Sequence, residues 1–105
     1  MINITLLNFD DGAPRGFIIK GHSGSAERGR DIVCAAVSSA AYLTANTLLE
    51  TVGVKADAEV DDGYMKFVVD ETCKSRASDF LNGFALHLNQ LREQYPAYVS
   101  IITEV

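Results

Sequence analysis

The stretch from Val54 to Val69, VKADAEVDDGYMKFVV, decides how the rest of the chain is interpreted. Apolar and charged residues alternate from Val54 to Val60, a pattern typical of a strand with one buried face. Asp61-Asp62-Gly63 then carries the Asp-Gly signal of a tight hairpin turn, and Tyr64 to Val69 follows as a second strand. The stretch therefore predicts a β-hairpin in the middle of the chain.

A helix is expected on each side of this hairpin. The first runs from Asp31 to about Thr51, with Asp31 as its N-cap and Gly53 just beyond its end. The second is capped by Ser75 and runs to about Gln94, where Tyr95-Pro96 stops it because the residue before proline avoids helical angles. Its apolar positions recur at helical spacing: Ala77, Phe80, Leu81, Phe84, Leu88 and Leu91.

Three further strands complete the pattern. Ile2 to Phe9 and Arg15 to Lys20 form a hairpin across a Gly- and Pro-containing turn, and Ala97 to Val105 is the last strand. The order is β-β-α-β-β-α-β, which is a ferredoxin-like core with an extra N-terminal strand. Two helices with apolar faces can cover one face of the sheet, so we expect an α+β fold, a two-layer sandwich, as one domain over residues 1–105.

Composition disfavours nucleic-acid binding and argues against secretion. The chain has 105 residues, 9 Lys plus Arg against 14 Asp plus Glu, and a net charge of -5, with no clustered basic patch for nucleic acid. Only two cysteines and no signal sequence indicate a cytosolic protein with reduced thiols. The stretch Ile32 to Leu49 has no charged residue, but Ser38, Thr44 and other polar residues interrupt it, so a buried core helix is preferred to a membrane span.

Cys34 is the first candidate for chemistry. If Asp31 caps the first helix, Cys34 lies in its first turn, where free N–H groups and the helix dipole favour a thiolate. His22, at the end of a strand, is the histidine nearest to it in sequence, and the loop between them can bring the two together. A Cys–His pair is the minimal unit of thiol protease chemistry. The alternatives are a small buried cysteine and a surface histidine.

The residues around this pair are open to two interpretations. Gly21, Gly24 and Gly29 form either a mobile gate beside the nucleophile or an ordinary strand-to-helix connection, and their spacing does not fit a phosphate-binding loop. Asp31 either orients His22 or only caps the helix, and capping is preferred. Ser38, one turn after Cys34, either enters the site or bonds back to a helix carbonyl, and the bond to the carbonyl is preferred.

Other reactive side chains are placed outside the site. Cys73 follows an acidic loop that disfavours its thiolate and is interpreted as structural, whereas His87 lies off the apolar stripe of the second helix and is expected to be solvated. The spacing of two cysteines and two histidines does not match a zinc site. Asp61 and Asp62 are interpreted as turn residues. No metal and no cofactor is therefore expected.

The segment that carries the Cys–His pair resembles a known family. Gly21-His22, the glycine-rich loop and Asp31-Ile32-Val33-Cys34-Ala35-Ala36-Val37-Ser38 are similar to the ribosomal-processing cysteine proteases called Prp. The resemblance runs over the whole chain, including its length and Tyr95-Pro96. Ser23 stands where the family pattern often has Ala, a small change that removes no catalytic group.

The resemblance implies a cytoplasmic, homodimeric endopeptidase. Its substrate would be the precursor of a large-subunit ribosomal protein, the one numbered twenty-seven, whose N-terminal extension is cut after a motif ending in an aromatic residue, typically Phe. The catalytic pair would be Cys34 and His22, with the glycine loop moving when substrate binds. An alternative from a different class stays open: a non-catalytic dimeric module that binds a ribosomal protein or an assembly factor, in which Cys34 is unreactive.

Overall fold

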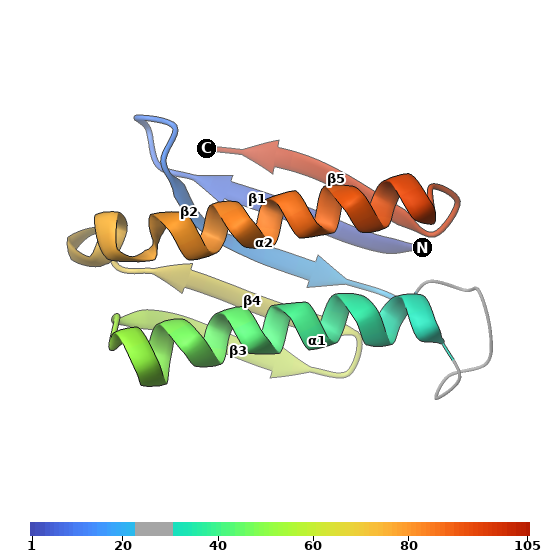
Figure 1. The fold of residues 1–105 in the computed structure, drawn as a ribbon, viewed down its shortest axis with the longest axis horizontal. Helices are drawn as coiled ribbons and strands as arrows, with labels where there is room; N and C mark the ends of the chain where they lie inside the picture. Colours follow the sequence, from blue (N-terminus) through green and yellow to red (C-terminus); the bar gives the residue numbers. More distant parts are fainter. Residues whose placement is uncertain (23–30) are drawn as a thin grey trace.

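A computed structural model describes residues 1–22 and 31–105 of the chain. Within these residues one sheet is formed by β1 (Ile2–Asn8), β2 (Pro14–Lys20), β3 (Ala56–Asp61), β4 (Tyr64–Val69) and β5 (Val99–Glu104). Two helices, α1 (Ile32–Asn46) and α2 (Lys74–Gln94), lie side by side over the same face of this sheet (Figure 1). The predicted two-layer α+β sandwich is confirmed, and so is the order of its elements.

The place of β1 in the sheet is a finding that chain order alone does not provide. The strand order is β3-β4-β2-β1-β5, and β1 pairs antiparallel with β2 and parallel with β5. The extra N-terminal strand is therefore inserted between β2 and β5, which would be neighbours in a simple ferredoxin-like sheet. Its insertion keeps the chain's first residues next to the end of β2, because Asn3 pairs with Lys20. On the other side, Ile2 pairs with Val99 at the start of β5.

The core lies between the sheet and the two helices. Phe17 of β2 is fully buried, and its ring centroid lies 5.7 Å from that of Phe67 on β4 and 4.5 Å from that of Phe84 on α2. Aromatic contacts of this kind fix how a helix lies on a sheet, because each ring buries a large apolar area in one orientation. The Phe17, Phe67 and Phe84 rings thus join β2, β4 and α2 at the centre of the molecule.

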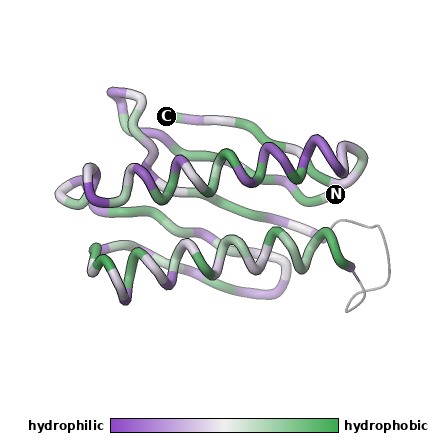
Figure 2. The backbone as a smooth tube through the Cα atoms, in the orientation of Figure 1, coloured by the Kyte–Doolittle hydropathy of each residue, from purple (hydrophilic) through white to green (hydrophobic). Residues whose placement is uncertain are grey.

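The helix over residues Ile32–Val52 is long and apolar enough to cross a membrane by length and composition alone. In the fold one side of it packs into the core, with Val33, Val37, Ala41, Ala45 and Leu48 buried at intervals of three to four residues. Figure 2 shows apolar colour along most of α1, whereas α2 alternates between apolar and polar turns. One face of the helix is thus in the core, as predicted, whereas its other face is open, with Ile32 and Leu43 68% and 69% exposed.

Both helices have ends that differ from the prediction. The first was expected to reach Thr51 as a single helix, but it continues beyond α1 as a π-helical segment, η1 (Thr47–Val52), and stops where Gly53 takes the left-handed φ of +80°. The predicted Ser75 cap is wrong. A 3-10 turn, η2 (Glu71–Cys73), precedes α2 because the carboxylate of Asp70 accepts the N–H of Thr72 at 3.0 Å and starts the helix earlier.

Three positions predicted to face the core are exposed: Ala58, Val60 and Phe80. Val60 is 54% exposed and Ala58 is exposed as well, because β3 is the edge strand of the sheet. Phe80, in the predicted stripe of α2, is 45% exposed, although Phe84 one turn later is buried. The strand starting at Val54 begins instead at Ala56, and the last strand begins at Val99.

Candidate active site

The start of α1 positions Cys34. Asp31 is the N-cap, with an extended backbone, and its Oδ1 accepts the N–H of Cys34 at 2.9 Å. The Asp31 side chain is buried, so the cap holds the first turn rigidly. Cys34 is half-buried, and its sulfur lies at the positive end of the helix dipole, where negative charge is stabilised. The predicted cap is confirmed.

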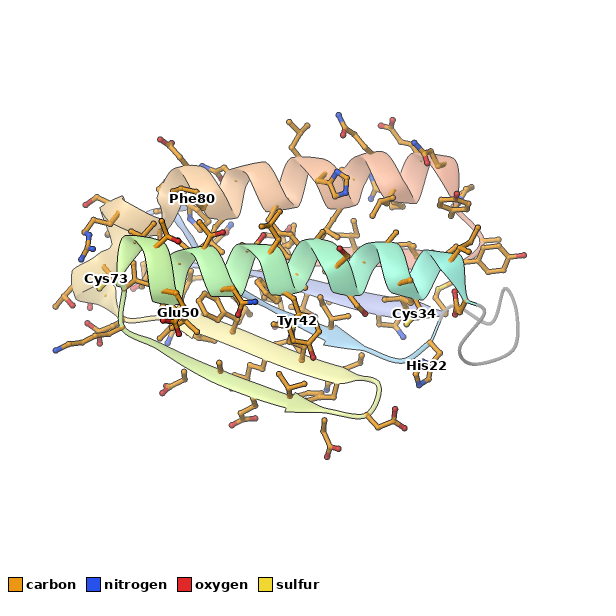
Figure 3. All side chains as sticks on the ribbon, turned by 60° about the horizontal axis from the view of Figure 1, so that its bottom comes forward. His22, Cys34, Tyr42, Glu50, Cys73 and Phe80 are labelled. Atoms are coloured by element: carbon orange, nitrogen blue, oxygen red, sulfur yellow. The ribbon has the colours of Figure 1, made fainter. Side chains whose placement is uncertain are left out.

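The end of β2 brings His22 to this sulfur. Nδ1 of His22 lies 3.8 Å from Sγ of Cys34, within hydrogen-bonding range for sulfur. Figure 3 shows the two side chains close together, one at the end of β2 and one in the first turn of α1. An imidazole nitrogen in this position can take the thiol proton and leave a thiolate, which is the nucleophilic form. The structure thus brings together the two residues that the sequence singled out.

A third element, the turn between β3 and β4, lies against the other side of the imidazole. Oδ1 of Asp62 is 4.0 Å from Nε2 of His22. A Cβ added to Gly63 would lie 3.1 Å from the same nitrogen. The local sequence pattern of these residues indicates only a turn. The missed signal is the register of β2 and β4, because the pair Lys20 and Tyr64 places this turn beside residue 22.

A cavity of about 220 Å³ opens beside the pair. Val37, Ala41 and Tyr42 line it from α1, and Met65 lines it from β4. Ser38 also lines this cavity and is half-buried, so it lies near the pair. The preferred expectation for Ser38, a bond back to a helix carbonyl, stays a prediction. The cavity is mostly apolar around the thiol and has room for one side chain of a peptide.

The glycine loop is described only in part. Gly21 has a φ of +93°, and a Cβ there would lie 2.7 Å from the carbonyl oxygen of Met1, so only glycine fits this position. Its N–H donates to the carbonyl of Gly63 at 2.8 Å. Gly24 and Gly29 lie outside the described residues, and a gating role for the loop stays a prediction.

Comparison with known proteins gives the family. A family model described as "Cysteine protease Prp" matches residues 1–100. The chain belongs to this family. It is therefore a cysteine protease of the Prp type, in agreement with the site described above and with the resemblance stated from the sequence.

Two curated relatives bear the name ribosomal processing cysteine protease Prp. The one from Bacillus subtilis is 25% identical over 111 aligned residues, which cover 100% of this chain and 99% of the relative. The one from Staphylococcus aureus is 27% identical over 97 residues, covering 90% of this chain and 92% of the relative. Both alignments span nearly the full length of both proteins.

Solved structures agree on the fold. The Staphylococcus aureus Prp structure with a covalently linked product peptide has a TM-score of 0.91 at 24% identity and covers 99% of this chain and 100% of its own. A Streptococcus mutans protein has a TM-score of 0.81 at 30% identity, covering 99% of this chain and 96% of its own. The two-layer fold of this chain is thus the fold of known Prp structures.

The remaining candidates lie away from the Prp site. Cys73 is buried, and its sulfur accepts the N–H of Lys55 at 3.4 Å. Figure 3 shows Cys73 at the opposite end of the molecule from Cys34. His87 is exposed on α2, as expected. Over residues 1–22 and 31–105, no group of three His, Cys, Asp or Glu side chains is arranged to hold a metal ion.

A larger hollow, of about 720 Å³, lies at the far end of the sheet from Cys34. Two of its charged groups pair with each other: Nζ of Lys74 lies 2.6 Å from Oδ2 of Asp11. This hydrogen bond lowers the pKa of Asp11 and raises the pKa of Lys74 relative to their usual values. Neither a cysteine nor a histidine is among the described residues that line the hollow, so its size does not make it the protease site.

Proposed function

We propose that this protein removes the N-terminal extension of a large-subunit ribosomal protein, number twenty-seven, with Cys34 as nucleophile and His22 as general base and acid. The observation that carries the proposal is the 3.8 Å separation of His22 Nδ1 and Cys34 Sγ at the start of α1. The names of the curated relatives, ribosomal processing cysteine protease Prp, support the substrate class.

The reaction follows from the positions of the two groups. Nδ1 of His22 takes the proton of the Cys34 thiol, and the thiolate sulfur bonds to the scissile carbonyl carbon. The C–N bond breaks as the protonated imidazole gives its proton to the leaving amine. Water then attacks the thioester while His22 accepts a water proton, and the returned proton restores the thiol as the acid product leaves.

The oxyanion formed in each step needs N–H donors at the start of α1. The N–H of Cys34 is bound by Oδ1 of Asp31, and that of Ala35 is bound by the Asp31 carbonyl at 3.0 Å. In a helix the N–H groups of the first residues have no acceptor within the helix. We therefore assign the oxyanion donors to the backbone of Ile32 and Val33 rather than to Cys34 itself.

Assembly state and location complete the proposal. We propose that the protein works as a homodimer in the cytoplasm, where its ribosomal substrate is made. Leu86 on α2 is 62% exposed and is a candidate contact between the two copies. Light scattering of the purified protein tests the dimer: twice the chain mass of 11.4 kDa is expected, and a mass of one chain at all concentrations would contradict it.

Cleavage of the recombinant precursor tests the proposed activity. Wild type should release the N-terminal extension, and Cys34→Ala and His22→Ala should each lose at least about 10³-fold in rate, because the two groups act as a unit. Cys73→Ala is the matched control and should keep its rate. Near-normal cleavage by Cys34→Ala would overturn the proposal, and tight binding without cleavage by wild type would favour the non-catalytic module.

A further inference from the structure

The turn between β3 and β4 lies beside Nε2 of His22, the ring nitrogen that has no role in the proposed Cys–His reaction. We propose that Asp62 is a positioning residue for His22: its carboxylate faces Nε2 and holds the ring with Nδ1 directed at the Cys34 sulfur. This inference rests on the proposed function, since it assigns a partner to the base of that reaction.

The two ring nitrogens of His22 face two different groups. Nδ1 is 3.8 Å from Sγ of Cys34, and Nε2 is 4.0 Å from Oδ1 of Asp62. In the neutral ring one nitrogen carries the proton and the other accepts one. A carboxylate at Nε2 favours the proton there, which leaves the lone pair of Nδ1 for the thiol. The same carboxylate stabilises the imidazolium after that proton has moved.

The backbone of the turn is fixed next to His22 by contacts of its own. The carbonyl of Gly63 accepts the N–H of Gly21 at 2.8 Å, which ties the turn to the residue before His22. Oδ1 of Asp61 accepts the N–H of Asp62 at 2.7 Å and shapes the turn. Gly63 has a φ of +62° and no side chain, so the turn approaches the imidazole closely. The position of Asp62 is therefore set by strand pairing and by the turn.

Asp31 is another carboxylate near the pair, but its geometry gives it a different role. Its Oδ1 accepts the N–H of Cys34 and caps α1. It thus acts on the cysteine side of the site, whereas Asp62 faces the imidazole nitrogen that Cys34 does not use. The preferred interpretation of Asp31 as a cap and the new assignment of Asp62 are consistent with each other.

The exposure of this pair limits the size of the effect. The side chains of His22 and Asp62 are 44% and 58% exposed, so water screens their charges. Groups that orient a metal-ligating histidine through its second nitrogen typically change activity by about 10- to 100-fold when mutated, and we take this as the scale for an oriented catalytic base. We expect the lower end of this range for Asp62, because a buried carboxylate would act more strongly.

The test compares Asp62→Asn with Asp62→Glu and with Asp57→Asn. Asp57 is an exposed carboxylate at the other end of β3, so its variant makes the same change of charge away from the site. We expect Asp62→Asn to lower kcat on the precursor about 10-fold with little change in KM. Asp62→Glu should recover part of this loss, and Asp57→Asn should match wild type.

A second readout separates positioning from a merely structural role. Proton–nitrogen NMR of the imidazole at alkaline pH, without substrate, reports which ring nitrogen carries the proton. Wild-type His22 should show the proton on Nε2, and Asp62→Asn should shift part of the population to Nδ1. An unchanged kcat, or a lower kcat with an unchanged ring spectrum, overturns the inference. Loss of the proposed function is recognised separately, because wild type would then fail to cut the precursor.

Discussion

Cys34 and Cys73 show how position within the fold decides what a thiol can do. Cys34 lies in the first turn of α1, half-buried, with an imidazole nitrogen 3.8 Å from its sulfur. Cys73 is 5% exposed, and its sulfur accepts a backbone N–H from Lys55. Burial among apolar groups disfavours a thiolate, whereas a helix N-terminus and a base favour it. The proposed role of nucleophile therefore belongs to Cys34, whereas Cys73 is a core residue.

At the residue scale, two turn glycines provide a matched pair of variants. Gly63 and Gly12 both have positive φ, +62° and +89°, but a Cβ on Gly63 would meet His22, whereas one on Gly12 meets nothing within 4 Å. Alanine should strain either turn by about 1–2 kcal/mol, seen in urea unfolding. Only Gly63→Ala should lower kcat, because its methyl group displaces the imidazole. Equal kcat values for the two variants would contradict the contact between this turn and the ring.

At the element scale, local patterns predicted most of the fold. The Asp31 cap, the Gly53 stop and the Asp-Gly turn each depend on residues close together in sequence, and each is present. The pairing of His22 with Cys34 could also be predicted, because one short segment between β2 and α1 joins the two residues. The nearness of Asp62 depends on β2 pairing with β4, a contact between distant parts of the chain that no local pattern specifies. The insertion of β1 was missed for the same reason.

The contact between α2 and β2 gives a stability prediction. Phe84 is 4% exposed and its ring lies 4.5 Å from that of Phe17, whereas Phe80, one turn earlier on α2, is 45% exposed. Phe84→Ala should lower the free energy of unfolding by about 3–5 kcal/mol, because it leaves a cavity in the core. Phe80→Ala is the matched control and should lose far less. Similar losses in urea unfolding would show that Phe84 is not the anchor of α2.

The bond between the β1–β2 turn and α2 predicts a pH dependence. Lys74 lowers the pKa of Asp11 below its usual 3.8, so their pairing stabilises the fold above that pH and is lost as pH falls through the lowered value. Asp11→Asn should therefore melt at a lower temperature than wild type at neutral pH. The difference should close in acid, and Asp10→Asn should behave as wild type. A difference that persists in strong acid would rule out the charged pair as its cause.

At the scale of the whole molecule, charge favours the proposed substrate. The chain carries a net charge of -5, and a basic precursor is attracted to it before contact. Such attraction raises the encounter rate and is screened by salt. It acts at long range and does not depend on any single contact in the cavity beside Cys34.

Added salt should therefore slow cleavage of the basic precursor at low substrate concentration more than at saturation. We expect kcat/KM for the basic precursor to fall as salt rises, while kcat at saturation stays nearly constant. A neutral peptide with the same cleavage sequence is the control and should show little salt dependence. The same salt response for both substrates would show that charge does not steer the precursor to the site.

The central claim is that the fold activates Cys34 through His22, and alkylation by iodoacetamide near neutral pH tests it most directly. Peptide mass spectrometry over time gives separate rates for Cys34 and Cys73 in the same sample. We expect Cys34 to react well ahead of Cys73 and to lose most of this advantage in His22→Ala, because the thiolate is the reacting form. Equal, slow labelling of both cysteines in folded wild type would contradict the account.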